Sequence, residues 1–86
     1  MILSGYETIF SGSEQLPDTM INGPVEIHAL PGNAAIIYIG SSDVSASNGY
    51  PLAAGEVLRI TFIANLNQLW YYSASMQGMS WCSRRL

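Results

Sequence analysis

The chain has 86 residues, of which 49% are hydrophobic and only 10% are Asp, Glu, Lys or Arg. An ordinary soluble domain carries about 25% charged residues, so the composition indicates one small domain whose surface relies on uncharged polar side chains. The net charge of −3 argues against a nucleic-acid-binding protein, which needs a basic stripe, and no apolar run approaches the ~18 residues of a membrane helix.

A domain of this size buries only about 60% of its unfolded surface and usually needs a disulfide, a metal or a partner subunit for stability. Cys82 is the only cysteine, which excludes an intramolecular disulfide, and no cluster of Cys and His offers a zinc site. We therefore expect a partner subunit. Residues 1–7 lack the basic and apolar regions of a secretory signal, so we expect a cytosolic origin, with Cys82 as a free buried thiol.

The first half of the chain shows short strand signals separated by turn residues, with no helical periodicity. In chain order, we expect an alternating strand over 6–10, a polar loop over 11–15, a short strand over 19–21, a turn at Asn22-Gly23-Pro24 and a second alternating strand over 25–30. In that last strand, His28 lies on the face opposite Val25 and Ile27.

The second half begins with the almost wholly apolar segment 34–39, which indicates a strand covered on both faces. We then expect a loop over 40–49, an extended piece over 50–52 and a turn at Ala54-Gly55. A strand over 56–63 follows, with Phe62 facing the core. The last expected elements are a strand over 66–75, a hairpin turn at Gln77-Gly78 and a strand over 79–83. Six to eight short strands predict an all-β fold: a single small antiparallel β-sandwich over residues 1–86, jelly-roll-like or immunoglobulin-like.

Catalytic residues are weakly indicated. His28 is the only histidine, and no serine sits in a nucleophile-elbow pattern that would make a Ser-His-Asp arrangement with Asp43. Asp43 and Glu56 flank the same loop, but a glycosidase needs a deep cleft between its two carboxyl groups. We expect no enzyme activity and no cofactor.

The loop from Asp43 to Gly49 has side-chain oxygens at every second position, as a calcium loop does. Only one of these ligands is charged and no glutamate stands at the twelfth position, so a serine-rich turn is the favoured interpretation and no metal is expected. Asp43, Ser45, Asn48 and the following Tyr50 are still candidates for contact with a partner protein.

Aromatic side chains gather near the C-terminus, at Trp70, Tyr71, Tyr72 and Trp81. Aromatic rings on an exposed β face stack on sugars, so a carbohydrate- or receptor-binding module is the alternative function. Trp70 and Tyr72 share one face of the predicted strand and Tyr71 occupies the other. At the end of the chain, the guanidinium groups of Arg84 and Arg85 suit docking onto acidic groups.

The run from Ile36 to Glu56 reads as an apolar-Tyr-Ile-Gly strand, a serine-rich Asp-Val loop, Asn-Gly, an aromatic residue and Leu-x-x-Gly-Glu. Together with the aromatic strand at 69–72 and the Ser80-Trp81 pair, it resembles small bacteriophage virion proteins. In physical terms, Gly40 and Asp43 turn the chain, and Asn48-Gly49 is expected to supply a left-handed turn.

The resemblance implies a structural virion protein, and specifically a capsid decoration (cement) subunit that binds the major capsid protein or other virion proteins. The same resemblance also leaves open a head-fibre protein or a tail-associated protein. It further implies a homotrimer made in the host cytoplasm. The residues expected to contact partners are Asp43, Ser45, Asn48, Tyr50, Trp70, Tyr72, Trp81, Arg84 and Arg85.

Overall fold

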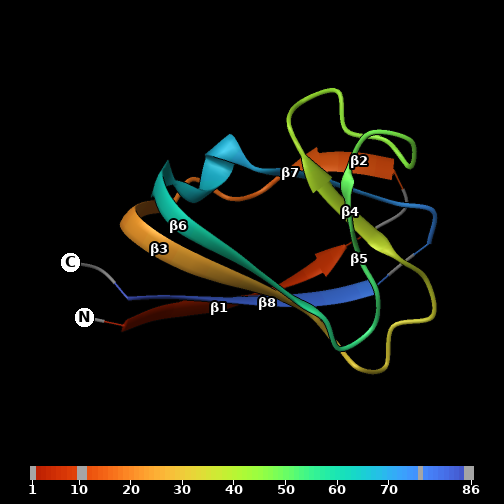
Figure 1. Ribbon diagram of the computed structural model, residues 1–86, viewed down its shortest axis with the longest axis horizontal. Coiled ribbons are helices and arrows are strands. Elements are labelled where there is room, and N and C mark those ends of the chain that lie inside the picture. Colours follow the sequence, from red (N-terminus) through yellow and green to blue (C-terminus); the bar gives the residue numbers. More distant parts are fainter. Residues whose placement is uncertain (1, 10–11, 76, 85–86) are drawn as a thin grey trace.

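The computed structural model describes residues 2–9, 12–75 and 77–84, without the side chains of Ile2 and Arg84, and forms two antiparallel four-stranded sheets (Figure 1). Sheet A contains, in spatial order, β1 (Ile2–Ile9), β8 (Gln77–Arg84), β3 (Met20–Ala29) and β6 (Val57–Asn65). Sheet B contains β2 (Gly12–Gln15), β7 (Trp70–Ser73), β4 (Ile37–Gly40) and β5 (Tyr50–Leu52). A short 3-10 helix, η1 (Leu66–Gln68), joins β6 to β7. The predicted all-β sandwich is confirmed.

The strand order is that of a jelly roll. The first strand pairs with the eighth, the second with the seventh, the third with the sixth and the fourth with the fifth. The chain is thus one long antiparallel hairpin that rolls up, so that every connection except β4 to β5 crosses from one sheet to the other. Of the two predicted topologies, this nested pairing fits the jelly roll, because an immunoglobulin-like sandwich has a different strand order.

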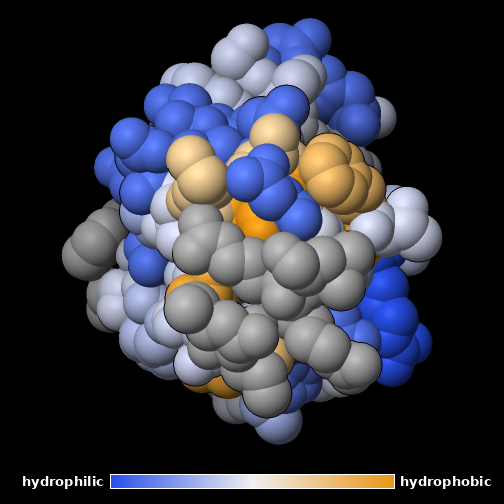
Figure 2. Space-filling view, turned by 90° about the vertical axis from the view of Figure 1, so that its left-hand side faces the viewer, coloured by the Kyte–Doolittle hydropathy of each residue, from blue (hydrophilic) through white to orange (hydrophobic). Residues whose placement is uncertain are grey.

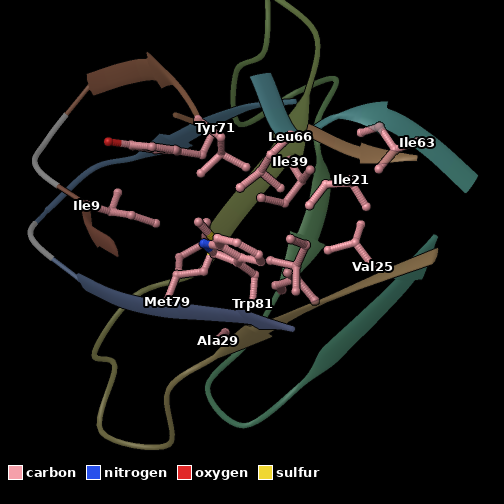
Figure 3. Packing of buried hydrophobic residues seen from close by; sticks show 14 residues of the cluster. Ile9, Ile21, Val25, Ala29, Ile39, Ile63, Leu66, Tyr71, Met79 and Trp81 are labelled. Atoms are coloured by element: carbon pink, nitrogen blue, oxygen red, sulfur yellow. The ribbon is translucent and has the colours of Figure 1, made fainter. Parts of the chain in front are cut away.

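The core lies between the two sheets and is built from the inward-facing side chain of every second strand residue (Figure 3). In β8 the inward positions include Met79 and Trp81, as their alternation with Ser80 and Cys82 predicts. Trp81 is only 7% exposed. Its neighbour in β1 is Gly5, where an added Cβ would lie 2.6 Å from the indole Nε1. Glycine at this position therefore makes room for the largest side chain of the core.

Two bulges interrupt the pairing of β3 with β6 and overturn two sequence predictions. The register shifts between Met20 and Gly23, and again between Gly23 and Val25. Asn22 has a φ of 48°, so the predicted turn at 22–24 is instead a bulge inside a continuous strand. The extra residue in β6 reverses the alternation of inward- and outward-facing side chains along the strand. Phe62, expected in the core, is therefore 63% exposed, and Ile63 is buried instead.

The bulged end of β3 and β6 carries apolar side chains at the surface. Met20 is 56% exposed and lies, like Phe62, at this end of sheet A. Figure 2, which looks at this end of the sandwich, shows hydrophobic surface between polar regions. A chain with so few charges thus also leaves large apolar side chains in water.

Other corrections follow from pairing that is distant in the sequence. Residues 12–15, predicted as part of a polar loop, form strand β2 against β7. Gln77-Gly78 is the start of β8 rather than a hairpin turn, because β7 and β8 lie in different sheets. The strand predicted over 34–39 begins only at Ile37, and Ile36 is exposed. The turn at Ala54-Gly55 is confirmed, with Gly55 at a φ of 84°.

Cys82 was expected to be buried and is exposed. It lies in β8 between the inward-facing Trp81 and Ser83, so its side chain points to the outer face of sheet A. Free thiols are usually buried, but the alternation of side chains along β8 places Cys82 on the outer face, so the prediction was wrong.

Candidate docking face

The outer face of sheet B carries three aromatic side chains, those of Tyr38, Trp70 and Tyr72, together with the ring of Pro51. We call these four residues the aromatic face. Tyr38 pairs in register with Pro51 on one side and with Tyr72 on the other, which puts these three in one row across β5, β4 and β7. Trp70 is two residues before Tyr72 and therefore on the same face. Their strand neighbours Ile37, Ile39, Tyr71 and Ser73 point into the core instead.

Two rings of the aromatic face, those of Tyr38 and Tyr72, pack against each other, and all four residues keep part of their surface in water. Tyr38, Trp70 and Tyr72 are half-buried and Pro51 is exposed. The centroids of the Tyr38 and Tyr72 rings are 6.2 Å apart, and the ring planes are tilted by 44°. This is ordinary aromatic packing on a sheet surface, which holds the two rings in fixed positions.

The serine-rich loop between β4 and β5 extends this face. Val44, in the middle of the loop, is buried. It packs onto Gly40 and Gly49, where an added Cβ would lie 2.9 Å and 2.8 Å from the valine Cγ2. An added Cβ on Gly49 would also be 2.6 Å from the Cβ of Tyr38. The loop is therefore anchored on the outer side of sheet B, beside the aromatic face.

Hydrogen bonds within the loop fix its polar side chains. The Ser41 hydroxyl donates to Asp43 Oδ1 at 2.8 Å, and the Ser45 backbone N–H donates to Asn48 Oδ1 at 2.8 Å. The Asn48 amide donates in turn to the carbonyl of Asp43 at 3.1 Å. These side chains cap turns, as the sequence predicts. The left-handed turn expected at Asn48-Gly49 was wrong, because neither residue has a positive φ, and Gly49 serves the close approach to Tyr38.

The structure brings together most of the residues that the sequence nominates for partner contact. Trp70 and Tyr72 lie on the outer face of sheet B, and Asp43, Ser45 and Asn48 belong to the loop anchored beside it. Tyr50 is exposed but pairs with the inward-facing Ile39, so it is not part of the aromatic face. Trp81 does not join them, because its side chain lies in the core. Arg84 ends β8 in sheet A, but its side chain and all of Arg85 lie outside the described residues. Sequence reasoning missed Tyr38 and Pro51, which only the pairing of β4 with β5 and β7 places here.

His28 lies on the outer face of the other sheet. It is half-buried and pairs with Val57 on β6 and Ser80 on β8. These residues line an open depression of about 630 Å³ together with Tyr6, Glu26 and Cys82. Glu26 forms an exposed ion pair with Arg59, 2.6 Å between Oε2 and Nε. Among the described residues, His28 forms no hydrogen bond to a serine. No three His, Cys, Asp or Glu side chains in this part of the chain lie close enough together to hold a metal ion.

Tyr71 forms a buried contact at the edge of the core. Its hydroxyl donates to Glu14 Oε2 at 2.8 Å, and its ring is buried between the sheets. Burial raises the pKa of the Tyr71 phenol well above its ordinary value of 10.0, and the hydrogen bond to Glu14 and the charges of Glu14 and Glu7 raise it further. The neutral phenol is therefore the form that the fold requires.

We expect the free energy of unfolding to fall as the pH rises above about 10, the ordinary pKa of tyrosine. The unfolded chain then releases the Tyr71 proton while the folded protein retains it, so the stability present below this pH is lost with rising pH. In Tyr71→Phe the decrease between about pH 9.5 and 11 should be flatter, as measured by urea unfolding. Tyr50→Phe, which changes an exposed phenol, is the control. Parallel profiles for Tyr71→Phe and the parent would contradict the prediction.

Two general findings bear on the site. No helix among the described residues is long and apolar enough to cross a membrane. Comparisons with protein-family models, with curated proteins and with solved structures return no match.

Proposed function

We propose that this protein is a non-catalytic structural subunit of a bacteriophage virion, most specifically a capsid decoration subunit that binds and stabilises neighbouring capsid proteins. The observation that carries the proposal is the aromatic face with its anchored loop. It offers half-buried aromatic rings and fixed polar groups on a surface that has few charges. Aromatic enrichment and depletion of charge are what distinguish the centre of a protein–protein interface.

The fold supports this proposal at the level of analogy. Jelly rolls occur in viral capsid and lectin domains, where the sandwich is a scaffold and its faces and loops make the contacts. The large exposed apolar side chains at the bulged end, Met20 and Phe62, add a second surface that an assembly would cover. In this role the protein spreads contact area over its neighbours, including copies of itself, and adds to the stability of the particle.

Removal of the protein from its particle provides the direct test. We expect particles that lack it to lose a surface density in electron micrographs and to release their genome at a lower temperature than complete particles. Adding back the purified protein should restore both properties. Complete and depleted particles with the same density and the same heat resistance would contradict the decoration role, and loss of density at the tail would assign the protein there.

Carbohydrate or receptor binding is the second candidate, because Trp70 and Tyr72 lie on one exposed face of a fold that also occurs in lectins. The geometry favours it less. A sugar stacks on a free, flat ring surface, whereas the rings of Tyr38 and Tyr72 are tilted by 44° and pack on each other. Binding on a glycan array that disappears in Trp70→Ala, with the fold intact, would reverse this preference.

A further inference from the structure

The four edge strands of the sandwich differ in how they are protected against pairing with another chain. β5 has three residues and contains Pro51, which has no N–H to donate, and β2 has only four residues. β6 pairs with β3 through two bulges, one in each strand, and carries the exposed Arg59. Short length, proline, bulges and charge are the usual means of blocking edge-to-edge association.

β1 lacks the short length, the proline and the bulges of the other edge strands. Its eight residues pair with β8 in unbroken register, from Ile2 with Arg84 to Ile9 with Gln77. It contains no proline and no basic residue, and Glu7, on its inward-facing side, is its one charge and its one feature that opposes edge pairing. An edge strand of this length and regularity presents a row of backbone N–H and C=O groups to a further strand.

The sequence of β1 is close to a palindrome centred on Tyr6. In a two-fold antiparallel pair with this centre, Leu3 would oppose Ile9 of a second copy, and Ser4 would oppose Thr8. The exposed hydroxyl side chains of Ser4 and Thr8 then meet on the outer face, on either side of Tyr6, whereas Ile9 is already fully buried in its own core. Gly5 would oppose Glu7, so the two carboxylates do not face each other.

We propose that β1 is the contact by which two copies of this protein associate, in an antiparallel β1–β1 pair centred on Tyr6. The two A sheets become one continuous sheet of eight strands. Tyr6, which is 58% exposed in one chain, lies on the two-fold axis against Tyr6 of the second copy. The self-complementary register is the reason for choosing a second copy as the occupant, since a two-fold interface requires each patch to fit itself.

This inference deepens the proposed function, on which it rests for the premise that the protein works in an assembly. The β1–β1 contact also implies a two-fold symmetry, which differs from the symmetry of a trimer. A β1–β1 pair gives a dimer or an even-numbered assembly, whereas the resemblance to virion proteins implies a trimer. The mass of the purified protein distinguishes the two.

The test uses light scattering coupled to size exclusion on the full chain at about 100 µM and after serial dilution. We expect a dimer for the parent protein. Ser4→Lys/Thr8→Lys, which places lysines opposite each other twice in the Tyr6-centred register, should weaken the dimer at least about tenfold. Ser4→Lys/Thr8→Glu, at the same positions, places opposite charges across the axis and should keep the dimer.

Val57→Lys is the matched control for added charge, because Val57 lies on the outer face of the same sheet but in β6, at the far edge. It should leave the dimer intact, and circular dichroism checks the fold of every variant. A monomer or a trimer for the parent protein would overturn the proposal, and so would equal association of the two double variants. Binding of monomeric variants to depleted particles is a separate measurement, so the capsid role and the β1 contact succeed or fail independently.

Discussion

Trp81→Ala is expected to lower the free energy of unfolding by about 3 to 5 kcal/mol, the range for removing a large aromatic side chain from a packed core. The indole is almost fully buried and fills the space that Gly5 leaves on the neighbouring strand. A small domain has a total stability of only about 5 to 15 kcal/mol, so this loss can approach all of it. Chemical unfolding followed by circular dichroism gives the difference directly.

Two comparisons separate packing from other effects of this substitution. Trp81→Phe keeps a ring in the core and removes the indole N–H, which is buried and has no hydrogen-bond partner among the described residues. Since an unpaired buried donor costs about 1 to 3 kcal/mol, we expect this variant to lose less than about half as much stability as Trp81→Ala. Trp70→Ala, on the half-buried aromatic face, should also cost less. Equal losses at Trp70 and Trp81 would contradict the assignment of Trp81 to the core.

Alternation along single strands was predictable from the sequence because it needs no knowledge of the partner strand. Trp70 and Tyr72 were expected on the face opposite Tyr71, and Met79 and Trp81 on the face opposite Ser80, and the structure has both arrangements. Alternation alone does not show which of the two faces is the inner one. Trp81 was nominated for partner contact, although it shares its face with the fully buried Met79.

The errors arose where distant segments determine the local conformation. Phe62 continues the alternation of Leu58 and Ile60, but a bulge imposed by pairing with β3 turns it to water. Residues 12–15 have a composition typical of loops, and their strand exists because β7 lies beside them. Tyr38 entered no predicted site, because the row that it forms with Pro51 and Tyr72 combines three separate strands.

Trp70→Ser/Tyr72→Ser is expected to abolish binding of the protein to depleted particles while leaving it folded. Both side chains lie on the outer face of sheet B, and their removal opens no cavity between the sheets. An aromatic hot-spot residue at the centre of an interface costs about 2 kcal/mol or more when truncated, so the double change should weaken binding about a thousandfold. Co-sedimentation with particles measures the loss, and circular dichroism checks the fold.

Phe62→Ser is the control that makes this result specific for one surface. Phe62 is the most exposed of the large hydrophobic side chains in the described part of the chain, and it lies in sheet A rather than on the aromatic face. If sheet B makes the contact, Phe62→Ser binds particles as the parent protein does. If instead Phe62→Ser loses binding and the double variant keeps it, the docking face is the bulged end of β3 and β6. Because the two surfaces belong to different sheets, the two variants decide between them without any change to the shared core.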